Sequence, residues 1–519
     1  MLRAGSQPTI SRNTTDAKRH WHIRTRAIHD IAQSKTGEHD MPGLTNKRWP
    51  NTAAAVFWTA VTVPLVATPL FVHAQNVPVA CAAATAPYRF LRYLEDFAFL
   101  RDPACRTDYL DGVKYFPIGE DAKRFFTLGG DLRLQSINAR YLSFGNEGGD
   151  NHNVAIERLH LHANFRLSKD LRLFTELKSN HQQNREPRAL VVDADRLDLH
   201  QAFVDFGNDQ SSQLRIGRQE IIYGSGRRIF PRNGPNVRGS LDAVRGMTQF
   251  KDLRLDAFAF RPVEVDAGVF DDSKINTQAF WGMYAVAAPP SLAPLKLDLY
   301  YIGAHRKGAR FSQGAAVEHR HSFGSRLFGK SGAWDFDHEF TVQWGTFGSG
   351  NIRAWSITSE SGYAWLAVPG RPRGSIRLTG GSGDRNPTDP DLQTFNAFSP
   401  RGGVVSDGFN ISPANALHAR AAIDFDITPT IRTTVALETL SRTSLRDGIY
   451  GPSGNLIRAP GGGSARHVGN DIDTTLTWTI DRHNTFALAA GKFVSGRFIK
   501  ESGAPRNMSF VTATYQFRF

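Results

Sequence analysis

An arginine-rich stretch at residues 214–246 carries the most distinctive chemistry in the chain. It holds seven arginines and only two acidic residues, Glu220 and Asp242. Glycines and prolines interrupt its middle, which predicts a loop between two short strands. A basic loop of this kind suits a phosphate cradle, a nucleic-acid surface or the lining of a pore for anions.

The sequence disfavours the first two of these uses. The glycines of the stretch lack the GxxxxGK[ST] spacing with which backbone N–H groups wrap a phosphate, and no recognised nucleic-acid module is present. His160 and His162 share one face of a predicted strand, but two histidines without a third ligand nearby indicate lumen lining rather than a metal site. We therefore expect no metal, no cofactor and no nucleic-acid partner.

Length and composition narrow the class of protein further. The chain has 519 residues, with 62 Lys+Arg against 49 Asp+Glu and a formal charge of +13. A hydrophobic content of 40% and a negative mean hydropathy exclude a helical membrane protein, which needs several apolar runs of about 20 residues. No linker divides the chain after residue 125, so one large domain is expected there.

One apolar run does occur, at residues 53–72. It follows Lys47 and Arg48 and ends in small residues before Ala74. A basic flank, an apolar core and a small-residue exit predict a secretory signal peptide over residues 41–74, with a membrane anchor as the alternative. Secretion also argues against nucleic acid as a partner.

The segments around this signal have no core pattern. Residues 1–40 are polar and basic, and we interpret them as a misassigned or disordered extension before a start at Met41. Residues 75–124 are aromatic and charged without a clean period, and we expect a short periplasmic extension. The two cysteines, Cys81 and Cys105, can form a disulfide in an oxidising compartment.

From residue 125 onward the sequence alternates with a period of two. Between residues 157 and 167, every second residue is apolar and the others are polar or charged. The same alternation recurs at residues 171–178, 295–301, 334–344 and 472–480. Each strand thus has one apolar and one polar face. Segments of about ten residues, charged polar faces and aromatic residues at strand ends favour a transmembrane barrel over a soluble sandwich.

The last twelve residues, 508–519, alternate aromatic and polar residues and end in Phe519. Such an ending resembles the signal that the outer-membrane barrel assembly machinery reads. We expect an all-β antiparallel barrel of about 18 strands, since single-chain bacterial barrels have even numbers. The strands are expected to centre near residues 133, 160, 175, 201, 216, 246, 257, 282, 299, 322, 340, 360, 378, 420, 436, 473, 488 and 513. The long connections are expected at 145–152, 184–195, 221–239, 262–275, 385–413 and 443–465.

Several stretches together resemble one known family. They include RALVVDADRLDLHQAFVDF and GSGDRNPTDPDLQTFNAFSPRG, and they lie at residues 88–119, 125–135, 157–167, 188–206, 214–246, 381–402, 412–418 and 450–473. With these stretches the chain resembles the alginate export family of outer-membrane channels. The resemblance implies an eighteen-stranded barrel over residues 125–519 in a Gram-negative outer membrane, with an arginine-lined, anion-selective pore. The best-understood relatives export alginate, a polyuronate, while other members carry other cargo.

Candidate pore residues come from strand parity, from the resemblance and from the central loop. Five arginines lie opposite a clean apolar face and are expected in the lumen: Arg133, Arg158, Arg166, Arg172 and Arg254. The resemblance adds Arg218 and Arg245. Arg232 belongs to residues 227–238, which we expect to fold into or over the lumen and narrow it.

At the start of the arginine-rich stretch, the alternation of inward and outward side chains does not by itself decide which arginine lines the pore. Arg215 and Arg218 cannot both point inward on a regular strand, and a bulge near Gly217 would reconcile them. We choose Arg218 from the resemblance.

These residues predict a function in anion transport. Fixed positive charge in a pore concentrates anions and excludes cations, and the planar guanidinium pairs with carboxylates at any physiological pH. We predict passive passage of an anionic polysaccharide or oligosaccharide, an alginate-like polyuronate, across the lipid of the outer membrane. The alternative is a general anion-selective porin for small carboxylated solutes.

Two other classes of barrel protein are disfavoured. No catalytic signature stands out, so we do not expect an enzyme. The segment before the first strand is too short for the plug of a TonB-coupled receptor.

Overall fold

The computed structural model describes residues 81, 88–120, 123–142, 144, 151–184, 191–208, 210–402, 411–452 and 454–519. Residues 76–519 form one compact unit. The predicted signal peptide at 41–74 and the segment 1–40 lie outside the described residues. No helix in the described part of the chain is both long and apolar enough to cross a membrane.

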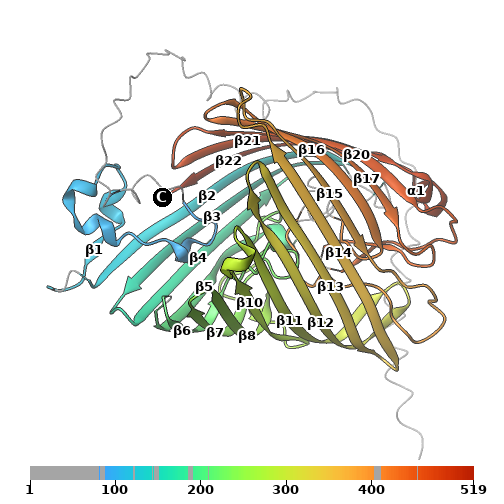
Figure 1. Ribbon diagram of the computed structural model, residues 1–519, viewed down its shortest axis with the longest axis horizontal. Coiled ribbons are helices and arrows are strands. Elements are labelled where there is room, and N and C mark those ends of the chain that lie inside the picture. Colours follow the sequence, from blue (N-terminus) through green and yellow to red (C-terminus); the bar gives the residue numbers. More distant parts are fainter. Residues whose placement is uncertain are drawn as a thin grey trace, which may run out of the picture. The chain divides into compact units, whose positions relative to one another are not determined.

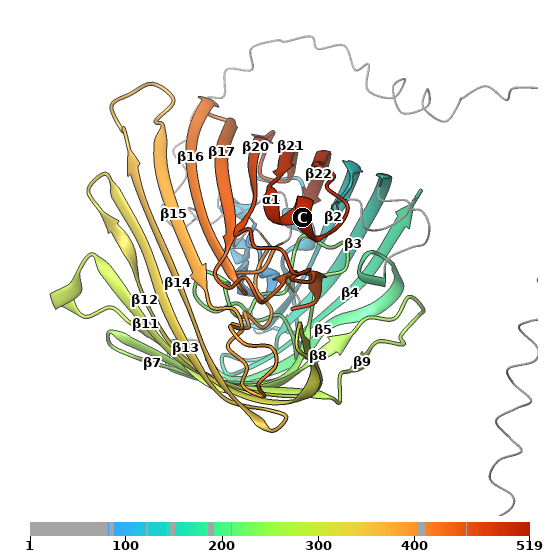
Figure 2. The same ribbon diagram turned by 90° about the vertical axis from the view of Figure 1, so that its right-hand side faces the viewer.

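Eighteen long strands form one closed antiparallel barrel in the described residues (Figures 1 and 2). Their bounds are β2 Phe125–Arg140, β3 Asn151–Arg166, β4 Leu171–Gln183, β5 Asp195–Gly207, β6 Ser212–Gln219, β7 Leu241–Phe250, β8 Leu253–Glu264, β10 Gln278–Ala287, β11 Leu295–Phe311, β12 Gly314–Ser331, β13 Trp334–Phe347, β14 Gly350–Ala364, β15 Arg373–Gly381, β16 Ala416–Thr428, β17 Ile431–Arg442, β20 His467–Thr479, β21 Asn484–Ser495 and β22 Met508–Arg518. β22 pairs with β2 and closes the sheet, which leaves no free edge in the barrel wall. Every predicted strand centre falls inside one of these strands.

The alternation in the sequence becomes the two faces of the barrel wall. On β6, Leu214 and Ile216 are 40% and 44% exposed, while Arg215 between them and Gln219 at the end of the strand are buried. Large apolar side chains therefore cover the outer face, where lipid replaces water, and polar side chains fill the interior. Trp334 and Trp344, near the two ends of β13, are also exposed on the outer face, as the aromatic girdles of a barrel would be.

The connections distinguish the two ends of the barrel. The long connections follow β2, β4, β6, β8, β15, β17 and β21, which all run in the same direction. In outer-membrane barrels the long loops are extracellular and the short turns periplasmic. The start of β2 and the C-terminal Phe519 therefore lie at the periplasmic end. A connection occurs at each predicted place, although residues 145–150, 185–190, 403–410 and 453 within these connections lie outside the described residues. A further connection between β21 and β22, which contains the helix α1 (Arg497–Ser502), was not predicted.

Short elements occur outside the barrel strands. They are η2 Arg92–Leu94, η3 Ala98–Arg101, η4 Pro103–Cys105, η5 Asp111–Val113, β1 Phe116–Pro117, η6 Val191–Asp193, β9 Ser273–Lys274, η7 Pro290–Leu292, β18 Ile449–Tyr450 and β19 Leu456–Arg458.

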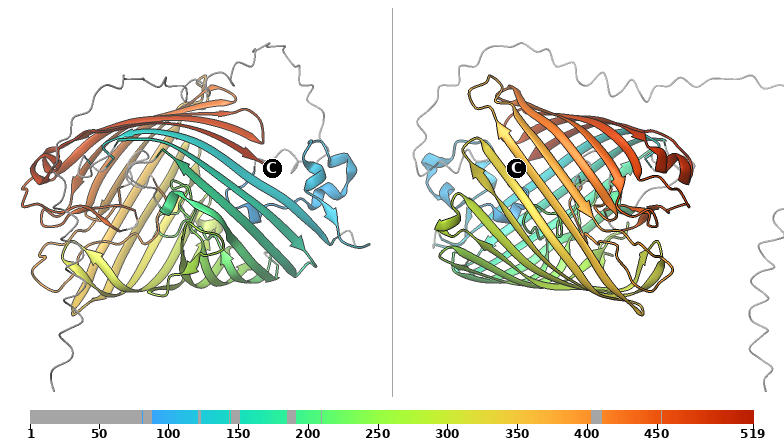
Figure 3. Two further views of the ribbon diagram at one scale, coloured as in Figure 1. Left: turned by 180° about the vertical axis from the view of Figure 1, so that it is seen from behind. Right: turned by 45° about the vertical axis from the view of Figure 1, so that its right-hand side comes forward.

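The N-terminal extension is ordered against the periplasmic end. Cys81 and Cys105 form a disulfide. The extension, drawn in blue, lies beside the C-terminus in both views of Figure 3. Arg92 joins the two, because its guanidinium donates to the carbonyl oxygens of Gly130 (2.7 Å) and Phe519 (2.6 Å). The extension is thus tied to the seam where β22 meets β2.

Two of the long loops fold into the barrel, where Figure 2 shows coil segments within the ring of strands. The loop between β6 and β7, residues 220–240, is called here the lumen loop. Arg158 of β3 donates to its backbone at Pro235 (2.7 Å), and the loop's own Arg227 donates to Asp337 of β13 (2.7 Å). Since β3 and β13 stand on opposite sides of the wall, the lumen loop crosses the interior as predicted. The loop between β15 and β16 meets it through a bridge between Ile229 and Ser399.

Candidate functional site

Strand register assembles a row of charged residues that are far apart in the sequence. Arg166 of β3 faces Arg172 of β4, which in turn faces Asp205 of β5. Asp205 also faces Arg215 of β6, and Arg215 faces Arg245 of β7. We call these five residues the arginine row. Because β3 ends at Arg166 and β4 begins one residue before Arg172, the row lies at the periplasmic mouth of the barrel.

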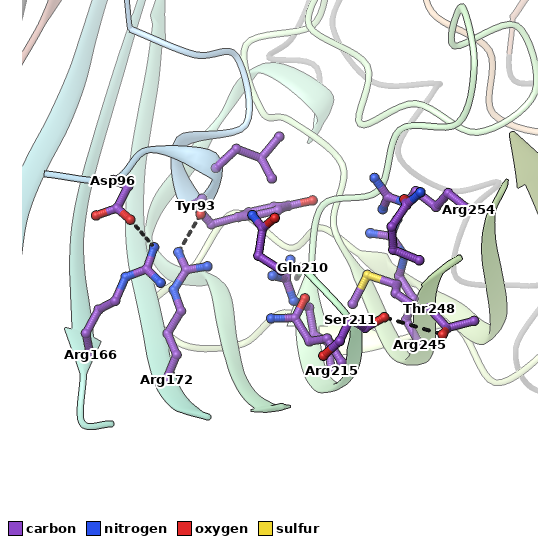
Figure 4. A pocket seen from close by; sticks show the side chains of 14 residues that line it. Tyr93, Asp96, Arg166, Arg172, Gln210, Ser211, Arg215, Arg245, Thr248 and Arg254 are labelled. Atoms are coloured by element: carbon purple, nitrogen blue, oxygen red, sulfur yellow. Dashed lines mark hydrogen bonds and ion pairs between the residues drawn. The ribbon is translucent and has the colours of Figure 1, made fainter. Parts of the chain in front are cut away.

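The arginine row opens onto a cavity of about 270 Å³, shown in Figure 4. We call this cavity the arginine pocket. Its lining includes four arginines of the row, Arg254 of β8, uncharged polar side chains and three residues of the N-terminal extension. The complete lining is Tyr93, Leu94, Asp96, Arg166, Arg172, Gln210, Ser211, Gln213, Arg215, Arg245, Met247, Thr248, Gln249 and Arg254.

Arg215 is the most rigidly held arginine of the pocket. Its guanidinium donates to both carboxylate oxygens of Asp205, at 2.7 and 2.9 Å. The rings of Tyr93 and Phe203 flank it, with centroids 4.2 and 4.0 Å from the guanidinium carbon. A bidentate carboxylate and two aromatic faces fix both the plane and the charge of this group.

The other arginines are held by single aspartates or by neutral oxygens. Arg172 donates to Asn164 Oδ1 (2.7 Å) and to the backbone carbonyl of Tyr93. Arg166 lies 3.5 Å from the carboxylate of Asp96. Arg245 and Arg254 share the carboxylate of Asp256.

Asp256 of β8 accepts from Arg245 and, at 3.0 Å, from Arg254 Nε. The pocket's five arginines therefore face three aspartates, at positions 96, 205 and 256, so the pocket keeps a net positive charge. Arg254 has 48% of its side chain exposed and Arg166 has 29%, which leaves both accessible to a solute.

The structure places the predicted arginines in three settings. Arg166, Arg172, Arg245 and Arg254 come together in the arginine pocket. Arg133 and Arg158 also point inward, but they bind the lumen loop at Asn233, and Arg232 is part of that loop. Arg232 lines a second cavity of about 180 Å³ together with apolar and aromatic side chains.

Arg218 stands apart from the other predicted residues. It has the parity of the outward-facing Leu214 and Ile216, and it pairs with Asp242 at 2.9 Å. The bulge expected near Gly217 is wrong, because β5, β6 and β7 pair through this position without a shift of register. An unbroken strand turns Arg215 inward and Arg218 outward.

Three groups of side chains in the described residues have the spacing of metal ligands. In one of them, His160 bonds to Glu176 at 2.7 Å and His200 lies beside it. Arg158 and Arg238 are charged neighbours of both histidines and oppose a bound cation. The other groups are acidic and likewise contact basic side chains: Asp198, Asp271 and Asp272 with Lys178, and Glu438, Asp471 and Asp473 with Arg420. We assign a metal to none of them.

Comparison with known proteins identifies the chain's relatives. The model of a family described as alginate export matches residues 125–514. The chain belongs to the alginate export family. It is a channel protein of the Gram-negative outer membrane. No curated protein matches it.

Several solved structures have a similar barrel but a low sequence identity to this chain. OccK2 (OpdF) of Pseudomonas aeruginosa, solved in complex with glucuronate, is 12% identical, with a TM-score of 0.52, and covers 78% of this chain and 99% of its own. OpdK of the same organism, solved with vanillate, is 11% identical with a TM-score of 0.52, covering 76% and 98%. A BenF-like porin from Pseudomonas fluorescens Pf-5 is 9% identical with a TM-score of 0.53, covering 76% and 99%. At these identities the likeness concerns the fold.

Two parts of the arginine pocket were not predicted from the sequence. Arg215 was set aside in favour of Arg218, although its alternation with Leu214 and Ile216 carried the signal for an inward side chain. Tyr93 and Asp96 lie in the extension, outside any period-two pattern, and nothing in their local sequence places them in the pocket.

Proposed function

We propose that this chain passes an anionic polysaccharide or oligosaccharide, an alginate-like polyuronate, through an arginine-lined, anion-selective pore. The arginine row is the observation that carries the proposal. Four guanidinium groups on β3, β4, β6 and β7 lie in one row at the periplasmic mouth, and the partly exposed Arg166, with Arg254 beside the row, offers contacts to a carboxylate-bearing polymer. A polyuronate repeats its carboxylate at every sugar, so it can move from one arginine to the next.

The strength of the site also suits transport. Conduction requires that each contact be weak enough for the cargo to leave. In the arginine pocket Asp205 and Asp256 already neutralise part of the charge. The remaining positive charge attracts anions without forming one deep site.

The second candidate is a general anion-selective porin for small carboxylated solutes. The lumen loop favours it, because a loop tied to opposite walls by Arg158 and Arg227 narrows the route for a polymer. Glucuronate, with which OccK2 was solved, is a suitable test solute of this class.

Planar-bilayer recordings test the proposal and separate the candidates. We expect anion-selective current that an oligouronate blocks and that a neutral oligosaccharide of equal length does not. Permeation of glucuronate without any block by the longer oligomer would favour the small-solute porin. Selectivity for cations would refute both.

We also propose that the barrel assembly machinery recognises β22 through Phe519. The support is the aromatic, alternating sequence of this strand and its place at the closing seam of the barrel. Deletion of Phe519 should lower the yield of heat-modifiable, folded barrel in the outer membrane, whereas deletion of an exposed residue in the β7–β8 turn should not.

A further inference from the structure

Residues 89–96 of the N-terminal extension enter the periplasmic mouth as a loop that is anchored at both ends. Tyr88 and Phe97, which flank it, are buried in one apolar cluster with Leu100, Tyr115 and Phe125. The disulfide between Cys81 and Cys105 fixes the chain further. We call residues 89–96 the mouth loop. Arg92 ties the middle of the loop to Gly130 and Phe519, and Leu91 and Tyr93 pack on Phe174 and Phe203, so a displacement of the loop must break these contacts as well.

The mouth loop supplies oxygen atoms to the arginine pocket. The carboxylate of Asp96 lies 3.5 Å from Arg166 Nη2, and the carbonyl oxygen of Tyr93 accepts from Arg172 Nη2. Figure 4 shows both contacts, with the ring of Tyr93 beside Arg215. A carboxylate and a carbonyl of the chain itself therefore occupy two arginines that face the pocket.

These contacts are of a kind that a solute can replace. The side chain of Asp96 is 56% exposed, and an ion pair of 3.5 Å in such a position contributes little stability. The carbonyl of Tyr93 is a neutral acceptor, whereas a carboxylate brings an opposite charge and can accept two parallel bonds from a guanidinium.

The mouth loop also contacts the lumen loop. Tyr93 Oη donates to the carbonyl oxygen of Glu220 at 2.9 Å. The ring of Phe90 stacks on Phe230 with centroids 5.2 Å apart, and the guanidinium carbon of Arg238 lies 4.1 Å from the centroid of the Phe90 ring. A displacement of the mouth loop would thus remove contacts from the loop that crosses the pore.

We propose that the mouth loop is a plug which anionic cargo displaces. Cargo carboxylates take the place of Asp96 at Arg166 and of the Tyr93 carbonyl at Arg172. The loop then swings out between Tyr88 and Phe97 and gives up the bonds of Arg92 to Gly130 and Phe519 and the packing of Tyr93 on Phe174 and Phe203. The lumen loop then loses its contacts with Tyr93 and Phe90. The plug thereby couples the arrival of cargo at the periplasmic mouth to the opening of the lumen. This inference rests on the proposed function.

Hydrogen–deuterium exchange of the full-length protein in detergent tests the plug. A uronate trimer should accelerate amide exchange in residues 89–96 and leave residues 98–117 unchanged, and a neutral trisaccharide should do neither. Asp96→Asn should accelerate exchange in the mouth loop about two- to five-fold without any cargo, as expected for the loss of a weak ion pair. Asp170→Asn is the matched control, because Asp170 is a carboxylate of a periplasmic turn outside the pocket.

The outcome separates the plug from the proposed function. Unchanged or slower exchange in residues 89–96, in a channel that the same trimer blocks, would overturn the plug and leave the function standing. A channel that no uronate oligomer blocks would overturn the proposed function, and acceleration in Asp96→Asn would then still show that the loop is held by this contact. Retained heat modifiability on gels establishes that each variant is a folded barrel.

Discussion

Arg215 of β6 and Arg245 of β7 occupy directly opposed positions in the barrel wall. Two like charges in this position repel each other. Each has its own buried carboxylate, since Arg215 binds Asp205 on one side and Arg245 binds Asp256 on the other. The arginine row is therefore not a run of bare positive charges, because Asp205 within it and Asp256 beside it neutralise and position its arginines.

Removal of one aspartate should destabilise the barrel strongly. Asp205→Ala leaves Arg215 buried without its carboxylate, and the loss of one partner from a buried pair costs about 3–5 kcal/mol. Denaturant unfolding in detergent measures the change. The control is Asp242→Ala, which removes the outward-facing partner of Arg218 at a more exposed site and should cost about 1 kcal/mol or less. Equal losses in the two variants would contradict the assigned burial.

Anion selectivity should depend on the accessible arginines of the pocket. The double variant Arg166→Gln/Arg254→Gln removes two partly exposed charges and should shift the reversal potential in a KCl gradient toward zero. The shift should shrink as salt rises from about 0.1 M to about 1 M, because the Debye length falls from about 10 Å to about 3 Å. Arg218→Gln should leave selectivity unchanged, since this side chain is held by Asp242 and by the carbonyl oxygens of Leu199 and Asp272, away from the arginine pocket. A loss of selectivity in Arg218→Gln alone would restore it as a pore residue.

Arg215 and Arg218 show what the sequence can predict about the site and what it cannot. Period-two alternation is local, so it located every barrel strand and the inward faces of β2, β3 and β4. It does not report register, and the arginine row exists only through the pairing of five strands. Gly217 led us to expect a bulge. Its φ is positive, at 131°, but β5 and β6 pair through this position without a shift of register.

Contacts across long stretches of sequence were equally beyond reach. Asp96 meets Arg166, and Arg92 meets Phe519 at the other end of the chain. Such contacts follow from closure of the barrel and from docking of an irregular segment, neither of which leaves a periodic signal. The arginines of the central loop suit one sector of a pore wall and predict that it folds into or over the lumen. The structure adds the acceptors that hold it there, such as Asp337 of β13.

Docking of the extension should depend on pH through Lys114. Burial, followed by the nearby charge of Arg92, lowers the pKa of Lys114 from 10.5 to about 7. Between these values the undocked extension binds a proton that the docked one does not, so docking becomes more stable as pH rises through this window and is independent of pH below it. The slope is at most about 1.4 kcal/mol per pH unit.

Unfolding of the extension, followed by denaturant titration from about pH 7 to about pH 9, measures this dependence. Lys114→Met keeps the apolar stem among the rings of Tyr88, Phe97 and Phe519 and should give a flat profile. A wild-type midpoint that falls as pH rises would contradict the sign derived for Lys114.

Release of the lumen loop from β3 should widen the pore. Arg158 donates to the Asn236 carbonyl, to Asn233 Oδ1 and to the Pro235 carbonyl, each at 2.7 Å. Hydrogen bonds from a charged donor contribute about 1.5–3 kcal/mol each, so Arg158→Met removes the main tie between the loop and this wall. Single-channel conductance should rise in the variant. Arg353→Met, on the outer face of β14, should conduct like the wild type. An unchanged conductance in Arg158→Met would mean that the other contacts of the loop, with Arg133, Asn180 and Asp337, set the width of the pore.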